Sequence, residues 1–116
     1  YALSYPERQK SGVDSLDLTQ QPSLEFLTPD LEAFSCLGLA YNALKAGKNA
    51  PATLNAANEI AVEAFLNKQI GFLDIGKTIE SVLDAVPTTN LDTLASVVEN
   101  DRISRQVAKS VIESRA

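Results

Sequence analysis

A chain of 116 residues is long enough for one small domain and too short for two. Its apolar content of 45% and charged content of 22% are typical of a folded globular protein and exclude a disordered one. The net charge of −5 and the pI near 4.6 predict no nucleic-acid partner and no anionic membrane partner, because neither would meet a basic surface. No apolar run reaches the roughly 18 residues that a membrane span needs.

Residue types that carry much of enzyme chemistry are nearly absent. The sequence has no histidine and one cysteine, Cys36, which excludes a His-based triad, a Cys-His pair and a Cys/His zinc site. The sequence also lacks methionine, so we expect it to be part of a longer protein. The single cysteine and the lack of a signal-peptide pattern favour a reducing, cytoplasmic compartment.

Residues 1–30 are expected to form the end of another structural unit and a linker. Tyr5 should leave helical angles because a proline, Pro6, follows it. Between Ser23 and Thr28 apolar and polar residues nearly alternate, which predicts a possible short strand. Pro29, directly after this stretch, would end it.

The pattern becomes helical in residues 31–116, the second predicted unit. A first helix should be capped by Asp30 or Ser35 and end at Gly47. A second should run from about Pro51 to Asn67, since proline is favoured in the first helical turn. The side chains expected to face the core from the first helix are Leu37, Ala40, Tyr41 and Leu44.

The second helix is the predicted centre of the fold. Its small alanines would let neighbouring helices approach closely, so we expect it to lie between several partners. Asn58 lies at the margin of its apolar side, where an unpaired amide would cost roughly 1–3 kcal/mol, so we expect a hydrogen bond near a helix junction. The apolar side comprises Leu54, Ala57, Ile60, Ala61, Ala64 and Phe65.

Three further helical stretches follow. Asp74 is the predicted N-cap of a third helix that Pro87 ends, and a short fourth helix should break near Asn100 and Asp101, where a last helix begins. The fold class is therefore mainly α, a small antiparallel bundle of four to five helices behind an extended linker. The residues expected to face inward are Ile75, Ile79, Val82, Leu83 and Val86, then Leu91, Leu94, Ala95 and Val98, and finally Ile103, Val107, Val111 and Ile112.

Several polar groups were weighed as binding or catalytic sites. Asn55, Asn58 and Glu59 could bind a sugar or a hard cation, but one helix supplies few convergent ligands, which favours helix caps, interhelical hydrogen bonds or a domain contact. Glu59 and Glu63 lie four residues apart, as on a solvated helix face, rather than as an acid/base pair. Cys36 has apolar neighbours and is interpreted as a small core residue.

The basic side chains near the end of the chain could dock on an acidic partner, although a solvated face is the favoured interpretation. These residues are Arg102, Arg105, Lys109 and Arg115. We thus predict no catalytic, cofactor-binding or metal-binding residue in the chain. One functional alternative from another class stays open, an independent helical protein-interaction module that binds through Leu54–Phe65 or the basic last helix.

An ordered series of short matches resembles the C-terminal part of the 1-deoxy-D-xylulose-5-phosphate reductoisomerase family. The longest is the block from Leu54 to Glu59, and the match is most specific from Tyr5 to Ile75. Ser35 departs from the family, in which many members have proline before the cysteine. The other matching segments are Tyr5-Pro6 with Arg8, Ser11-Gly12-Val13, Leu16-Asp17-Leu18, Pro29-Asp30, Phe34, Cys36-Leu37, Leu39-Ala40, Pro51-Ala52, Ala64-Phe65-Leu66, Ile70, Phe72 and Ile75.

The resemblance implies a parent enzyme of non-mevalonate isoprenoid biosynthesis. Such enzymes rearrange 1-deoxy-D-xylulose 5-phosphate and reduce the product with NADPH and Mg²⁺ or Mn²⁺ to 2-C-methyl-D-erythritol 4-phosphate. It implies a homodimeric parent in the cytoplasm, bacterial rather than plastid, whose central catalytic domain is the partner of this bundle. No residue of the chain matches the family's metal, phosphate or NADPH motifs, so the resemblance implies a structural and inactive domain.

Overall fold

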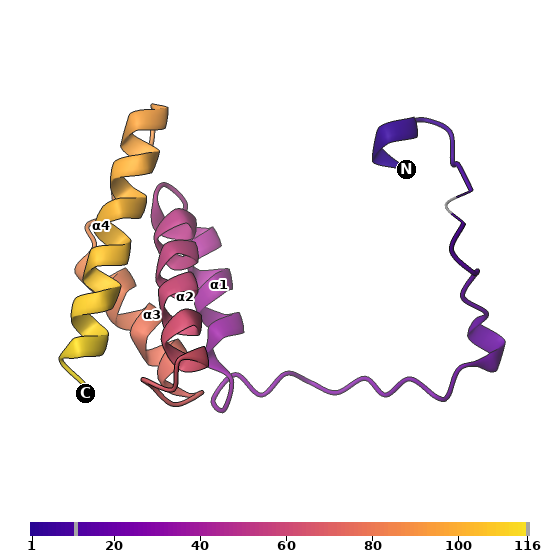
Figure 1. Cartoon of the computed structure of the whole chain (residues 1–116), viewed down its shortest axis with the longest axis horizontal. Coiled ribbons are helices and arrows are strands. Elements are labelled where there is room, and N and C mark those ends of the chain that lie inside the picture. Colours follow the sequence, from indigo (N-terminus) through magenta and orange to yellow (C-terminus); the bar gives the residue numbers. More distant parts are fainter. Residues whose placement is uncertain (11, 116) are drawn as a thin grey trace.

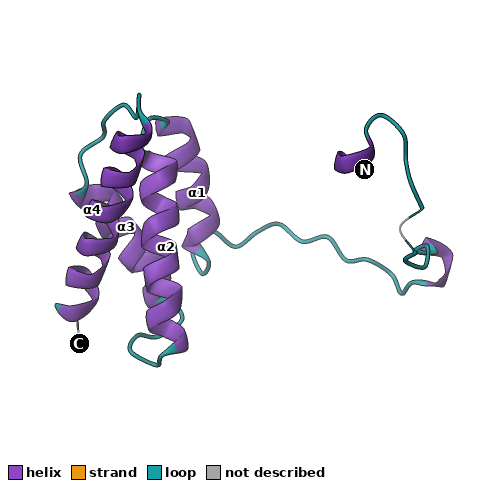
Figure 2. Ribbon diagram, turned by 45° about the horizontal axis from the view of Figure 1, so that its top comes forward, coloured by secondary structure: helices purple, strands orange, loops and turns teal. Residues whose placement is uncertain are grey.

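A computed structural model describes residues 1–10 and 12–115 as a helical bundle with a long extended segment before it (Figure 1). In these residues the bundle comprises α1 (Ser35–Ala46), α2 (Ala50–Leu66), α3 (Asp74–Ala85) and α4 (Leu94–Glu113). Consecutive helices run in opposite directions (Figures 1 and 2). The predicted mainly α fold and antiparallel bundle are confirmed. No helix in the described ranges is both long and apolar enough to cross a bilayer.

Helix α2 occupies the centre of the bundle, as its sequence predicts. It contacts each of the other three helices, whereas α1 and α4 lie on opposite flanks of it and do not touch (Figure 2). Its alanines Ala56, Ala57 and Ala61 are fully buried, which lets the neighbouring backbones approach closely. The bulkier Leu54 and Phe65 pack only at the margin of the core.

Helix α3 carries the predicted core stripe. Ile75, Ile79, Val82 and Val86 are buried and Leu83 is half-buried. Asp74 is the first helical residue rather than the N-cap, so α3 begins one residue earlier than predicted. Its carboxylate still accepts the Gly71 N–H at 3.1 Å and pairs with Lys77 at 2.9 Å, so it stabilises the start of α3.

The predicted break at Asn100 and Asp101 is wrong, because α4 is one continuous helix of 20 residues. Asn100 is buried and directs its amide to other helices, while Asp101 pairs with Arg105 one turn later. Neither side chain therefore competes with its own helix backbone. The helix begins at a capping box, in which Thr93 and Ser96 exchange side-chain to backbone hydrogen bonds of 3.1 Å.

The core face of α1 differs from prediction, and that of α4 differs in its first half. In α1 the buried residue is Ala43, with Leu39 half-buried, and the four predicted inward residues are exposed. In α4 the buried residues are spaced four apart, at Asn100, Ser104, Ala108 and Ile112. The prediction is confirmed for Ile112, and Val107 and Val111 pack against the core, whereas the predicted Leu94, Ala95 and Val98 are exposed. Small side chains thus face the alanine-rich centre, because they allow the closest helix packing. Several larger apolar side chains, such as Tyr41 and Val98, remain on the outside.

The segment before the bundle is extended and nearly fully exposed. It contains two short 3₁₀ turns, Ala2–Ser4 and Leu18–Gln20, and neither contacts an α-helix. The predicted strand at 23–28 is wrong, since nothing within 1–10 and 12–115 pairs with this stretch. Asp30 caps the turn ahead of α1 by accepting the Glu32 and Ala33 N–H groups, and α1 itself has no side-chain cap.

Candidate functional site

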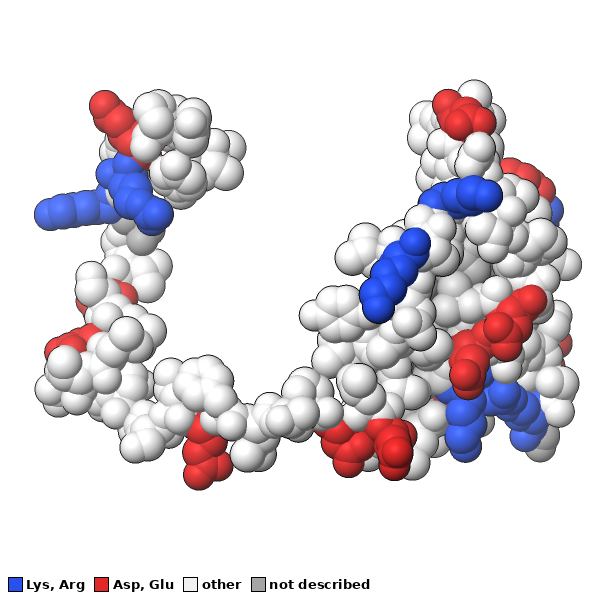
Figure 3. Space-filling view, turned by 180° about the vertical axis from the view of Figure 1, so that it is seen from behind, with Lys and Arg blue, Asp and Glu red and all other residues white. Residues whose placement is uncertain are grey.

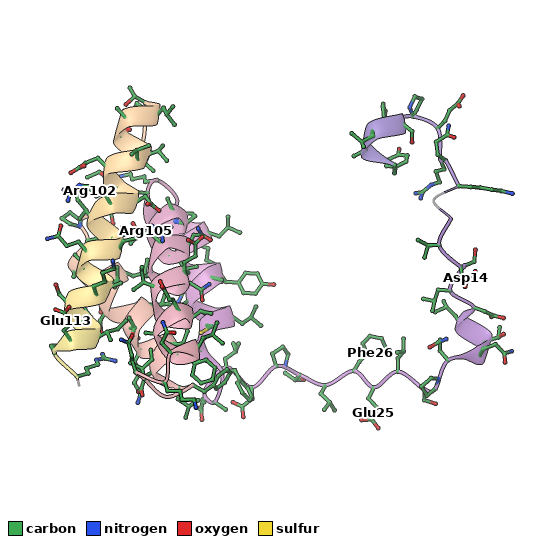
Figure 4. The ribbon with its side chains drawn as sticks, viewed as in Figure 1. Asp14, Glu25, Phe26, Arg102, Arg105 and Glu113 are labelled. Atoms are coloured by element: carbon green, nitrogen blue, oxygen red, sulfur yellow. The ribbon has the colours of Figure 1, made fainter. Side chains whose placement is uncertain are left out.

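A charged network on the surface joins α2 to α4. Arg105 donates from Nη2 to Glu59 Oε2 at 2.6 Å and from Nε to Asp101 Oδ2 at 2.7 Å, and Asn55 Nδ2 donates to Glu59 Oε1 at 3.0 Å. Figure 4 shows Arg105 reaching from α4 toward α2. Glu59 thus pairs across helices with Arg105, a partner that the sequence pattern does not identify, whereas the bond from Asn55 lies within α2.

The network changes the acidity of its members. The hydrogen bond from Arg105 lowers the pKa of Glu59 below its ordinary value of 4.5, and Asn55 adds to this effect. Hydrogen bonds to Asp101 and Glu59 raise the pKa of Arg105. Arg105 therefore stays charged, and Glu59 is an ion-pair partner rather than a proton donor at neutral pH.

We expect the bundle to lose stability as the pH falls below about 4.5, because Glu59 then takes up a proton. The folded-state pKa of Glu59 is the lower one, so its contribution is present above the unfolded value and disappears as the pH passes through the folded value. The measurement is urea unfolding between neutral and acid pH for the wild type and Glu59→Gln. The stability difference between them should shrink as the pH falls.

The control for this measurement is Glu63→Gln. Glu63 lies one helical turn beyond Glu59 and makes no side-chain ion pair with any residue that the structure describes. This variant should follow the wild-type pH dependence. A stability difference between wild type and Glu59→Gln that stayed constant with pH would contradict a role for the Glu59 charge.

Asn58 does not make the predicted hydrogen bond. Its side chain is half-buried and has no hydrogen-bond partner among the described residues. It lines a shallow hollow of about 460 Å³ along the outer side of α2, together with Glu59, Val62, Glu63, Leu66 and Asn67. Solvent reaches this margin, so Asn58 needs no protein partner there.

A buried polar network that sequence reasoning missed holds the upper end of the bundle together. Asn49 Nδ2 donates to the Pro87 carbonyl at 2.9 Å and to Asn100 Oδ1 at 2.8 Å, and Asn49 Oδ1 accepts the Thr89 N–H at 2.9 Å. Asn100 Nδ2 in turn donates to Thr53 Oγ1 at 3.1 Å. The network fixes the α1–α2 loop, the α3–α4 loop and α4 relative to one another.

Cys36 is exposed, which contradicts the predicted core position. It lines an apolar hollow of about 270 Å³ between the start of α1 and the start of α3. Gly76 brings the two helices together here, since a Cβ at that position would lie 2.5 Å from Ser35 Oγ. The other lining residues are Ala33, Phe34, Phe72, Leu73 and Ile75.

The charged side chains of α4 are mostly paired. Arg102 pairs with Glu99 at 2.8 Å and Arg105 with Asp101 at 2.7 Å, and Arg115, just after the helix, donates to Ser81 Oγ at 2.9 Å. Both signs of charge are spread over the bundle surface in Figure 3. This arrangement favours a solvated face over an acidic partner. Within 1–10 and 12–115, no three acidic or cysteine side chains gather closely enough to hold a metal ion.

A family model described as DXP reductoisomerase C-terminal domain matches residues 1–107. The chain belongs to this family. Two reductoisomerases illustrate how close the match is. The protein from Vesicomyosocius okutanii is 54% identical over 113 residues, which are 97% of this chain and 30% of the relative. The protein from Cupriavidus metallidurans is 52% identical over 116 residues, which are 100% of this chain and 30% of the relative.

Solved reductoisomerase structures share the fold. The Zymomonas mobilis enzyme in complex with NADPH matches with a TM-score of 0.91 and 42% identity, over 98% of this chain and 30% of that one. A DOX-P reductoisomerase with fosmidomycin and magnesium matches with a TM-score of 0.85 and 42% identity, over 97% and 30%. The reductoisomerase domain described here thus spans about 30% of its relatives' length. The matched region includes the extended segment before the bundle.

Proposed function

We propose that this chain serves as the structural C-terminal domain of an NADPH-dependent 1-deoxy-D-xylulose-5-phosphate reductoisomerase. The parent would rearrange and reduce its phosphosugar to 2-C-methyl-D-erythritol 4-phosphate with Mg²⁺ or Mn²⁺. The observation that carries the proposal is the match of nearly the whole chain to about 30% of each reductoisomerase. Relatives solved with NADPH and with magnesium support the choice of cofactors.

The proposed division of labour leaves cofactor and cation binding to the part of the parent outside this chain. Glu59 and Asp101 are acidic residues that could be considered as cation ligands. Arg105 binds both carboxylates, and this arrangement does not fit a divalent cation. The bundle instead supplies a rigid body, stabilised by the buried network around Asn49 and Asn100. Such a body would hold the catalytic domain in position, as the residues packed around a binding site hold its ligand-binding side chains.

The proposal extends to organisation and location. Residues 1–30 would belong to the end of the catalytic domain and the linker, and residues 31–116 would form the bundle domain. The central catalytic domain of the same chain would be its partner, within a homodimeric parent. The matched relatives are bacterial, which supports a bacterial parent in the cytoplasm.

The test compares NADPH consumption by the full-length protein and by the 116-residue chain, each with the phosphosugar and Mg²⁺. We expect turnover by the full-length protein and none by the chain alone, because residues 1–10 and 12–115 bring together no constellation of acid, base and cation ligands. Turnover by the chain itself would contradict a structural role. An inactive but folded full-length protein would contradict the reductoisomerase assignment.

A further inference from the structure

A hollow at the lower end of the bundle gathers three basic side chains. It has a volume of about 640 Å³ and lies where the α2–α3 loop, the first turns of α3 and the residues after α4 meet. Lys68 lines it from the loop, Lys77 from α3, and Arg115 from beyond the end of α4. Figure 3 shows basic side chains at this end of the bundle. We call this site the basic hollow.

The basic hollow carries an excess of positive charge. Asp74 is its one carboxylate among the described residues, so three cations against one anion leave two positive charges unbalanced. The chain as a whole has a net charge of −5, and the hollows beside Glu59 and Cys36 have no basic residue among their described lining residues. The carbonyl ends of α2 and α4 offset about one unit of the excess, whereas the amide end of α3 adds about half a unit. Part of the excess therefore remains for an anion to neutralise.

Two of the three cations are already held in place by α3. Arg115 Nη2 donates to Ser81 Oγ at 2.9 Å and to the Lys77 carbonyl at 3.4 Å, and Lys77 Nζ donates to Asp74 Oδ1 at 2.9 Å. Arg115 Nε and Nη1 have no hydrogen-bond acceptor among the residues that the structure describes. A guanidinium held at one nitrogen, with its other donors open, can bind two oxygens of an anion and loses little further side-chain entropy.

The carboxylate of Asp74 leaves room for a second anion. Its Oδ2 accepts the Gly71 N–H at 3.1 Å and its Oδ1 binds Lys77, so both oxygens are engaged by the loop and by α3 itself. The hydrogen bonds from Lys77 and Gly71, with a smaller effect of the Arg115 charge, lower the pKa of Asp74. Lys68 and Arg115 make no ion pair with any residue in the described ranges. These two cations are the ones that an incoming anion would pair with.

A phosphate group matches the charge and the size of the basic hollow. A dianion balances two positive charges, and its oxygens accept hydrogen bonds from guanidinium and ammonium groups. The volume falls within the range of about 300–1,000 Å³ that is typical of small-molecule sites, and the uncharged Gln69 and Ile70 line part of it. We propose that the basic hollow binds the phosphate group of a small solute, inorganic phosphate or a polyol phosphate, on Lys68, Lys77 and Arg115.

This site is separate from the reaction proposed for the parent. It lies entirely within the bundle, and its ligand would tie the α2–α3 loop to α3 and to the end of α4. Because the three segments converge only in the folded bundle, the bound anion would stabilise the folded state. The proposal therefore holds whatever reaction the rest of the parent catalyses.

The first test is an amide NMR titration of the 116-residue chain at constant ionic strength and neutral pH. Inorganic phosphate and glycerol 3-phosphate should shift the Gly71 and Lys77 amides along saturable curves, with a Kd on the order of 1–10 mM because the site is exposed. Glycerol alone should shift neither amide. Equal Kd values would assign the site to free phosphate, and tighter binding of the ester would assign it to a phosphorylated metabolite. Shifts that spread over the bundle without saturating would overturn the proposal.

Matched variants show whether the three cations form the site. Lys68→Gln with Arg115→Gln should raise the Kd at least about tenfold, because two charge-assisted hydrogen bonds are lost. The control, Lys48→Gln with Lys109→Gln, removes the same two charges elsewhere and should leave the Kd within about twofold, since salt screens distant charges. Lys68→Glu, which disturbs no described side-chain hydrogen bond, should abolish binding in a bundle whose spectrum stays dispersed. Equal weakening by the two double variants would reject the site.

The second test uses hydrogen exchange of the full-length protein, measured by mass spectrometry. At a Kd of about 10 mM, about 20 mM inorganic phosphate should slow exchange at the start of α3 about threefold in the wild type. The Lys68→Glu variant should show no slowing there, and slowing in both proteins, or in neither, would contradict the proposal. A full-length protein that shows the slowing but no reductoisomerase turnover would keep this site and reject the proposed function. Turnover without the slowing would do the reverse.

Discussion

Replacing Ile79 with alanine is expected to lower the free energy of unfolding of the bundle by about 2–5 kcal/mol. Ile79 is 2% exposed and packs in the core cluster formed by α2, α3 and α4. The buried side of α2 is rich in alanine, which lets the helices pack closely. The cavity left by the substitution therefore cannot collapse, which places the loss in the upper half of the range.

The measurement for Ile79→Ala is urea unfolding of the 116-residue chain, followed by far-ultraviolet circular dichroism. Leu94→Ala is the control, because Leu94 is 79% exposed and its truncation should change stability by no more than about 0.5 kcal/mol. A loss below about 1 kcal/mol for Ile79→Ala would show that α2 and α3 can move together to fill the space.

Replacing Asn49 with alanine should cost about 2–4 kcal/mol, which makes it the most damaging polar substitution in the chain. Asn49 is 2% exposed and satisfies the Pro87 carbonyl, the Thr89 N–H and Asn100 Oδ1 at once. Its removal takes a donor from the buried Asn100 Oδ1 and breaks the partly buried bonds to the Pro87 carbonyl and the Thr89 N–H. Urea unfolding of the chain measures the loss.

Two further variants test the reason for the Asn49 effect. Asn49→Asp keeps the shape and the acceptor for Thr89, but it faces the Pro87 carbonyl and Asn100 Oδ1 with oxygen instead of N–H. It should destabilise as strongly as alanine at neutral pH, whereas Asn55→Ala, which removes one exposed bond to Glu59, should cost little. An Asn49→Asp variant as stable as wild type would reject the hydrogen-bond explanation.

The sequence predicts the core faces of α2 and α3 well because each of these helices has one apolar side. The stripe of α3, from Ile75 to Val86, and the alanines of α2 leave no second choice for the core face. Helices α1 and α4 each have apolar residues on two sides, and several of the larger side chains, such as Tyr41 and Val98, lie on the side away from the core. Periodicity cannot rank two stripes when close packing favours small residues inside.

Polar contacts within one helix can be predicted from the sequence, whereas contacts between helices cannot. The bond from Asn55 to Glu59 joins residues four apart on one helix, a spacing that sequence alone reveals. The partners Glu59 and Arg105 are 46 residues apart, and Asn49 meets Asn100 across 51 residues. These pairings depend on how the helices pack. At Asn100 the sequence therefore indicates a turn or a helix break, although this residue is a buried hydrogen-bond partner inside α4.

Helix α1 is held only weakly by the rest of the bundle, so its folding is coupled to its assembly with the catalytic region. Helix α1 is held by α2 and α3 alone, and Ala43 is its only fully buried side chain among the described residues. Such a helix is the first part of a bundle to open and the first to lose hydrogen-exchange protection. A catalytic region that binds only the closed form of α1 would raise the free energy of that opening. By reciprocity, substitutions that loosen α1 would weaken docking without touching the contact itself.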